Sequence, residues 1–166
     1  MALSATITVD FQAALTRALD LVTGSSQLAY RKSLAFTNGA GLNQAQYLFH
    51  DQRTLTAGAN EDLDLAGVLT DIYGNALTFA TVKGMLFFLP STAGGDLTVT
   101  AKATNGFASW AGAAGDAIKV KPGGLVLFLA PGADGYAVTA ATGDLVTVTN
   151  GDGAASVTYD VILMGD

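Results

Sequence analysis

The pattern of hydrophobic and polar residues along this chain is that of β-strands. In residues 5–11, Ile7, Val9 and Phe11 stand at alternate positions with polar residues between them, and residues 154–164 repeat the alternation. Successive side chains of an extended chain point to opposite faces, so this spacing predicts strands with one buried face. Further strands are expected over 28–36, 47–55, 61–65, 77–89, 97–101, 118–121, 124–130, 135–141 and 144–149.

The run from Leu125 to Ala130 differs because it contains six apolar residues and no alternation. The segment 120–124, Val-Lys-Pro-Gly-Gly, precedes it as a turn, and Pro131-Gly132 ends it. A run this short, bounded by proline and glycine, predicts a strand buried on both faces rather than a helix. Such a strand requires other strands and sheets around it.

Local signals divide the chain between these runs. Asn38-Gly39 and Asn105-Gly106 are turn signals because both residue types tolerate a positive φ. Gly84, inside the expected strand 77–89, predicts a bulge or a bend. Residues 11–19 could form one or two helical turns, closed by the Thr-Gly-Ser-Ser sequence at 23–26.

The fold class that follows is all-β. No helical segments of about 10–15 residues separate the strands, which argues against a parallel sheet with crossover helices. We expect one antiparallel β-sandwich domain over residues 1–166, with about eight or more strands and little helix. A jelly roll, an immunoglobulin-like sandwich and a barrel are all physically possible. The jelly roll is favoured because its roughly eight strands match the count here.

Composition agrees with a compact domain and excludes several classes. Half of the 166 residues are hydrophobic and 13% are charged, so the chain can bury a sizeable core. Its apolar runs are shorter than the roughly 20 residues that a membrane helix needs. The net charge of −6 disfavours nucleic acid as a direct partner, because phosphate is repelled.

The chain has no cysteine, which excludes disulfides and cysteine-based metal or redox sites. Residues 1–10 contain neither a basic segment nor a continuous apolar one. They therefore do not resemble a secretory signal, and we expect synthesis in the cytoplasm.

The polar residues predict no enzyme. His50, the only histidine, precedes Asp51 and could be a general base, but neighbouring residues on a strand point to opposite faces. No serine stands in a Gly-x-Ser-x-Gly sequence. We therefore expect no catalytic residues, no cofactor and no metal. The acidic residues that could hold calcium lack the spacing of a calcium loop and fit a solvated edge better. They are Glu61, Asp62, Asp64 and Asp71.

Contact with other proteins is the remaining prediction. Trp110 lies in an Ala- and Gly-rich loop, residues 107–116, where it could anchor an interface or cover the end of the core. Residues 1–11, as an N-terminal contact strand or arm, and the loops 38–47 and 105–116 combine apolar residues with irregular chain. The candidate interface residues are Ile7, Val9, Phe11, Tyr47, Phe107 and Trp110.

Several sequence blocks resemble a family of small all-β virion structural proteins encoded by tailed bacteriophages and prophages. The resemblance covers roughly residues 50–166, about two thirds of the chain. The blocks are turn and strand patterns without a defined site motif. They are 50–55, HDQRTL; 61–67, EDLDLAG; 74–79, GNALTF; 120–124, VKPGG; 129–131, LAP; 135–139, GYAVT; 143–145, GDL; and 157–160, VTYD.

The resemblance implies a capsid decoration, or cement, protein on the outside of the phage head. Its partners would be the major capsid protein and further copies of itself, as a dimer or trimer, with no membrane or nucleic acid. The protein would be made in the cytoplasm of the host bacterium and then reside on the virion. A component of the tail or fibre, or a carbohydrate-binding receptor module, is the alternative.

Overall fold

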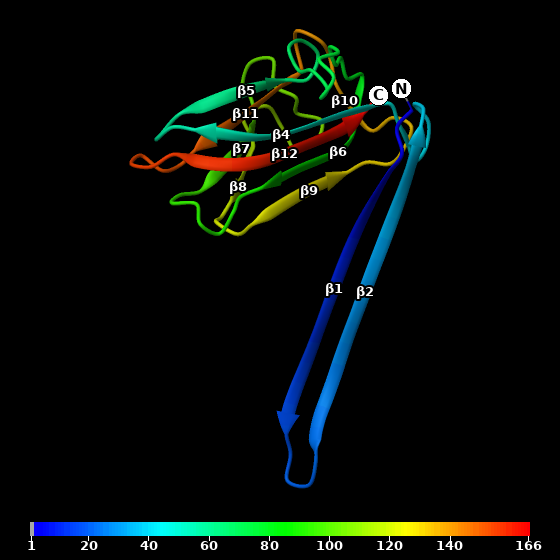
Figure 1. Ribbon diagram of the computed structural model, residues 1–166, viewed down its shortest axis with the longest axis vertical. Helices are drawn as coiled ribbons and strands as arrows, with labels where there is room; N and C mark the ends of the chain where they lie inside the picture. Colours follow the sequence, from blue (N-terminus) through cyan, green and yellow to red (C-terminus); the bar gives the residue numbers. More distant parts are fainter. Residues whose placement is uncertain (1) are drawn as a thin grey trace.

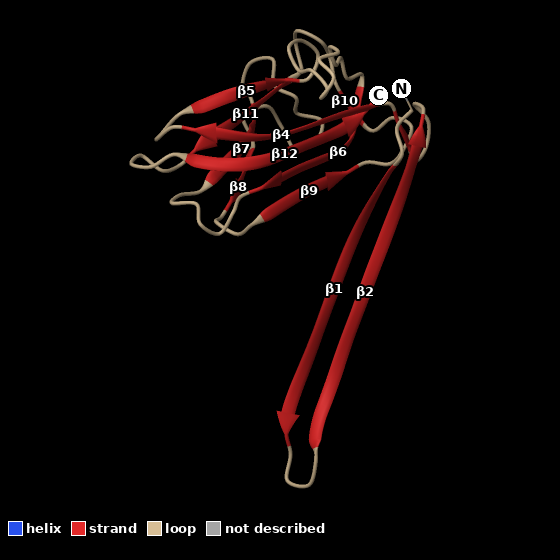
Figure 2. Ribbon diagram, in the orientation of Figure 1, coloured by secondary structure: helices blue, strands red, loops and turns tan. Residues whose placement is uncertain are grey.

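The structure, a computed structural model, describes residues 2–166 and is all-β (Figures 1 and 2). The described residues form twelve strands in three sheets, with no helix and hence none that could cross a membrane. The strands are β1 (Ala5–Ala18), β2 (Thr23–Asn38), β3 (Gln44–Ala45), β4 (Tyr47–Leu55), β5 (Asn60–Asp64), β6 (Thr81–Phe88), β7 (Leu97–Ala101), β8 (Ala117–Val120), β9 (Leu125–Leu129), β10 (Tyr136–Ala137), β11 (Leu145–Asn150) and β12 (Val157–Gly165).

The molecule has a body, residues 44–166, and an arm, residues 5–38. The body contains a five-stranded sheet in the order β10-β6-β12-β4, with β9 also paired to β6, and a four-stranded sheet in the order β5-β11-β7-β8. We call them the β12 sheet and the β11 sheet. The arm is the hairpin of β1 and β2, and its sheet also includes the short β3.

The two body sheets share one hydrophobic core. Alternate residues of β12, Val157 to Leu163, are fully buried, and so are Val146 and Val148 of β11. The alternation predicted for residues 154–164 is thus confirmed. Tyr159 and Phe87 pack with their ring centroids 6.3 Å apart within this core. Burial of these inward rows is the main stabilising term of the body.

The arm leaves the body as a two-stranded ribbon (Figure 1). All fourteen residues of β1 pair with β2, from Ala5 opposite Phe36 to Ala18 opposite Thr23. At 3.3 Å per residue the ribbon is about 45 Å long. Only its base contacts the body, where Phe36, Ala45 and Met164 form a second buried cluster.

Two sequence predictions are wrong in this fold. Residues 11–18 are strand, not helix, because each of them pairs across the hairpin, and this pairing overrides local helical preference. Strand β9 was expected to be buried on both faces, but it pairs only with β6 and lies at a sheet edge. Leu125 is 56% exposed, and the other four residues of β9 are only partly buried.

The irregularity expected at Gly84 is present. The pairing of β12 with β6 shifts there, so that Met164 faces Gly84 while Gly165 faces Val82. The extra residue is Lys83, whose side chain is fully buried. Its ammonium group lies 3.4 Å from the Asp166 carboxylate and donates to the carbonyls of Gly132, at 2.6 Å, and Ala133. The bulge thus directs a charge into a site with three oxygen partners.

Replacing Lys83 by alanine should destabilise the protein by about 3 kcal/mol or more, because it leaves a buried carboxylate and two carbonyls without their partner. Lys119→Ala is the control, since Lys119 is exposed and Lys121 also pairs with Asp96. Its effect should stay within about 0.5 kcal/mol. Urea unfolding measures both, and equal effects would contradict this account.

Candidate functional site

The arm has one polar and one apolar face. Residues directly opposite each other in an antiparallel pair lie on the same face. On the polar face, Thr8 and Ser33 hydrogen bond at 2.9 Å, and Asp10 lies 4.0 Å from Arg31. On the apolar face, each successive row contains at least one large hydrophobic residue. The rows are Ile7 with Leu34, Val9 with Lys32, Phe11 with Tyr30, Ala13 with Leu28, and Leu15 with Ser26.

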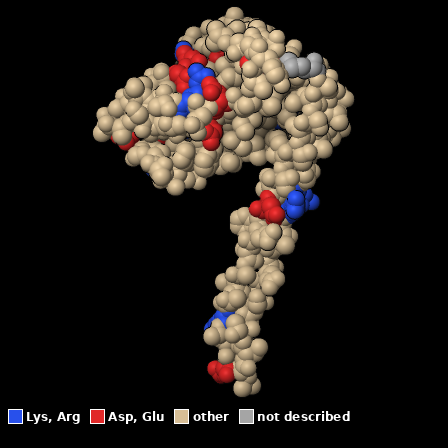
Figure 3. Space-filling model, in the orientation of Figure 1, with Lys and Arg blue, Asp and Glu red and all other residues tan. Residues whose placement is uncertain are grey.

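Most of the apolar face is open to solvent. Its base is covered, since Ile7 and Leu34 pack on the second cluster. Beyond the base, Phe11 is 58% exposed and Leu15 is 76% exposed. The turn at the tip adds Leu21 with an almost fully exposed side chain. Figure 3 shows the arm as a thin projection with few charged side chains.

This exposure conflicts with what a two-stranded ribbon can sustain alone. An isolated hairpin is marginally stable in water, and a third strand or a packed face is normally required. Contiguous exposed apolar surface on a soluble protein marks a site of interaction. We therefore take the apolar face of the arm as the first part of the candidate site.

The second part is the outer face of the β12 sheet. Register places Ile162, Leu86 and Leu127 in one row across β12, β6 and β9. The next row contains Phe88 and Leu125, with Asp160 at its end. Ile162 is 40% exposed, and Leu86, Phe88 and Leu127 are partly buried. This face is more apolar than an outer sheet face in contact with water normally is.

The two surfaces meet at Gly84. A Cβ placed on this glycine would lie 3.5 Å from each of the side chains of Ile7, Leu129 and Met164. The absence of a side chain thus allows the base of the arm to pack directly on the sheet. The apolar face of the arm and the outer face of the sheet form one continuous surface with a corner at this residue.

The predicted interface residues fall into two groups. Val9 and Phe11 lie on the exposed apolar face of the arm, and Ile7 lies at its base. The other three pack in the body. The ring of Tyr47 packs edge-on against that of Phe79, with the ring centroids 5.9 Å apart.

Phe107 is fully buried in the main core, so its side chain is not presented to a partner. Trp110 packs against Phe128 with centroids 4.8 Å apart, and its indole Nε1 is buried without a hydrogen-bond partner. Of the two roles left open for Trp110, its packing here is that of a cover over the core.

Sequence reasoning missed Leu15, Leu28 and Tyr30 as site residues. Their signal was present, since the even positions 28, 30 and 34 are large and apolar while 27, 31 and 33 are polar. It was obscured on the first strand by Ala13 and Ala14, which make residues 11–19 look helical. The outer face of the β12 sheet was missed because β9 was assigned to a sheet interior.

His50, considered above as a general base, is exposed on β4. It lies in a groove of about 360 Å³ together with Asp51 and Asp71. The Asp51 carboxylate lies 3.3 Å from Arg53, which belongs to a partly buried cluster with Glu61 and Tyr159. There Arg53 donates to Glu61 at 2.8 Å, and the Tyr159 hydroxyl donates to the other oxygen of Glu61 at 2.8 Å.

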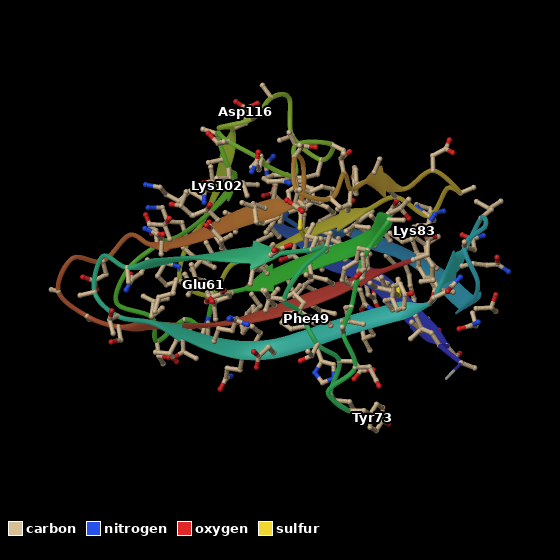
Figure 4. The ribbon with its side chains drawn as sticks, turned by 90° about the horizontal axis from the view of Figure 1, so that it is seen from above. Phe49, Glu61, Tyr73, Lys83, Lys102 and Asp116 are labelled. Atoms are coloured by element: carbon tan, nitrogen blue, oxygen red, sulfur yellow. The ribbon has the colours of Figure 1, made fainter. Side chains whose placement is uncertain are left out.

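This cluster is structural. Burial, followed by the hydrogen bond to Glu61, raises the pKa of Tyr159 far above that of free tyrosine, so the phenol stays protonated. Figure 4 shows Glu61 within the body, whereas Tyr73 lies at the end of a projecting loop. The carboxylate satisfies both a guanidinium and a hydroxyl, which explains how these polar groups are accommodated at the core.

The acidic residues considered for calcium each have their own partner. Asp62 pairs with Lys102, Asp64 accepts a hydrogen bond from the amide of Ala66, and Asp71 accepts from the amides of Tyr73 and Asn75. Within residues 2–166, no three acidic or histidine side chains gather closely enough to hold a metal ion.

Comparison with known proteins found no matching family model, no matching curated protein and no matching solved structure. The resemblance to phage virion proteins therefore stays a prediction. The function has to be argued from the two connected surfaces.

The Glu61 cluster makes a prediction about stability. Tyr159→Phe removes one hydrogen bond and should cost about 1 kcal/mol, because Arg53 still neutralises Glu61. Glu61→Ala leaves the buried Tyr159 hydroxyl without an acceptor and Arg53 with Asp51 as its remaining carboxylate partner, and it should cost about 2 kcal/mol. Thermal or urea unfolding compares the two variants. A greater loss in Tyr159→Phe than in Glu61→Ala would contradict the structural role of the carboxylate.

Proposed function

We propose that this protein is a non-enzymatic structural component of a tailed-phage virion. Specifically, we propose that it is a decoration protein that binds the outside of the head and stabilises it by protein–protein contacts. The observation that carries the proposal is the arm. The arm is a ribbon about 45 Å long, at 3.3 Å per residue, that projects from a compact body and has an uncovered apolar face. Such a feature serves assembly rather than catalysis.

We further infer that the body is a jelly roll. With the two-residue β3 and β10 set aside, its eight strands in chain order are β4, β5, β6, β7, β8, β9, β11 and β12. The first pairs with the eighth, the second with the seventh, the third with the sixth and the fourth with the fifth. These nested pairs are what a long hairpin rolled into two sheets produces. Jelly rolls occur in viral capsid proteins and in lectins.

The charge distribution supports an extracellular particle surface as the location. The body is acidic, and Figure 3 shows its charged side chains gathered on one part of the visible face. Net negative charge keeps closely spaced copies soluble and disfavours nucleic acid. In this proposal the protein is made in the cytoplasm of the host bacterium. It then binds the major capsid protein and further copies of itself at the capsid surface, without a membrane.

A tail, fibre or carbohydrate-binding module is the second candidate. The observation that favours it is Tyr73, which is 72% exposed and lines a groove of about 580 Å³ together with Ile72 and Tyr47. Exposed aromatic rings stack on sugars in many binding sites. Binding to an array of bacterial surface glycans, lost in Tyr73→Ala, would favour this candidate.

Co-sedimentation with heads of the parent phage, assembled without this protein, tests the decoration role. Saturable pelleting at a fixed ratio to the major capsid protein is expected, and heads that already carry the protein should bind no more of it. A folded protein that stays in the supernatant with bare heads would contradict the decoration role and favour the tail or receptor module.

A further inference from the structure

The apolar face of the arm cannot be covered by its own body. The ribbon is anchored at one end only, where Ile7 meets Gly84. From there it runs away from the body and does not fold back along the β12 sheet (Figure 1). The exposed part of the apolar face of the arm and the outer face of the β12 sheet thus lie uncovered on the two sides of the corner at Gly84 in one copy. Whatever covers them belongs to another molecule.

The sequence of β9 gives independent evidence of what covers the sheet. Its run Leu125 to Leu129 is typical of a strand buried on both faces, yet in a single copy its outer side chains face solvent. An apolar layer over Leu125 and Leu127 would supply the environment that the sequence predicts. The layer has to cover rows of side chains that extend across three strands, from Ile162 on β12 to Leu127 on β9.

The arm has the dimensions of that layer. The exposed apolar face of the arm extends along β1 from Val9 to Leu15, a length of seven residues or about 23 Å at 3.3 Å per residue. The outer sheet face is about 10 Å wide across β12, β6 and β9, since neighbouring strands are about 4.8 Å apart. These strands are five to nine residues long. A two-stranded ribbon is similarly wide, so one arm covers one sheet face.

The charges of the two surfaces are complementary. The arm carries three basic and two acidic side chains, and the rest of the chain carries five basic and twelve acidic ones. On the apolar faces themselves the contrast is sharper. Lys32 is in the second row from the base of the arm's apolar face, opposite Val9, and Asp160 borders the apolar rows of the sheet. Opposite charges at the border of an apolar contact favour one partner and one orientation.

We propose that each copy lays its arm across the outer face of the β12 sheet of a second copy of this chain. Every copy gives one arm and receives one, which makes a ring where the rotation between copies closes. The proposal includes this closure, with two or three subunits in the ring. The proposal concerns self-assembly alone and holds whether the particle surface is a head or a tail.

Cross-linking between two single-cysteine variants tests the contact directly. Because the natural chain has no cysteine, each variant carries one thiol. Leu15→Cys on the arm, mixed with Leu125→Cys on the sheet and treated with a short bismaleimide, should give a covalent dimer that contains one of each. Gln12→Cys is the matched control, since Gln12 is on the polar face of the same strand. Its yield with Leu125→Cys should be at least several-fold lower.

Two outcomes would overturn the proposal. Equal yields from Leu15→Cys and Gln12→Cys would mean that the contact has no facial preference. Covalent dimers from Leu15→Cys alone, and none with Leu125→Cys, would mean that arms pair with arms instead of with sheets.

Sedimentation velocity of the intact protein provides the second measurement. The wild type should be a dimer or trimer, and the double variant Phe11→Ser/Tyr30→Ser should weaken self-association at least about tenfold, or roughly 1.4 kcal/mol. Gln12→Ser/Gln27→Ser on the polar face should leave it unchanged. Far-ultraviolet circular dichroism checks that the body stays folded. A wild type that is monomeric at every concentration would overturn the proposal.

The same variants separate this inference from the proposed function. If the wild type is monomeric and Phe11→Ser/Tyr30→Ser no longer pellets with heads, the arm binds the shell. The arm exchange is then wrong and the decoration role stands. If the arm exchange forms as described but the protein ignores bare heads, the decoration role is wrong and the arm exchange stands.

Discussion

A two-stranded ribbon has two faces and no interior, and this constraint governs the whole molecule. Any apolar side chain on the arm has to be covered by something outside the hairpin. The body meets this need only at the base, where Phe36 and Ile7 reach Met164 and the glycine at position 84 leaves room for them. The remainder of the apolar face extends past the body. In the proposed assembly a neighbouring copy would cover this remainder, and binding would then stabilise the arm.

The sequence was informative wherever one face of a strand is buried. The alternation in residues 154–164 located β12, because period-two burial is a strong local signal. The sequence was misleading where the conformation of a segment is determined by residues that are far from it along the chain. Residues 11–18 adopt strand because β2 pairs with them, which no local window contains. The all-β class could be predicted, whereas the length and projection of the arm could not.

The candidate site could be predicted only in part for the same reason. Val9 and Phe11 followed from alternation near the N-terminus, but their neighbours on the face come from a strand about twenty residues later. Phe107 was selected because it is aromatic and close to a loop, and composition does not distinguish a core aromatic from an exposed one. The misassignment of β9 is the most useful of these errors. Its run of apolar residues was interpreted as a sign of burial on both faces, whereas the structure leaves its outer side chains partly exposed at a sheet edge.

The attachment of the arm also determines how the molecule would respond to force. The amide of Asn43, just after the arm, donates to Pro131 after β9, and the amide of Gln46 donates to Gly165 at the end of β12. Strand β12 is hydrogen bonded to β4 and β6 on its two sides. The covalent chain itself continues from the arm through β3 into β4, the edge strand of that sheet. A pull on the arm would therefore reach β4 first, and the two hydrogen bonds at Asn43 and Gln46 would pass part of the load to the ends of β9 and β12. The short segment between the arm and β4 is in this sense the mechanical joint of the molecule.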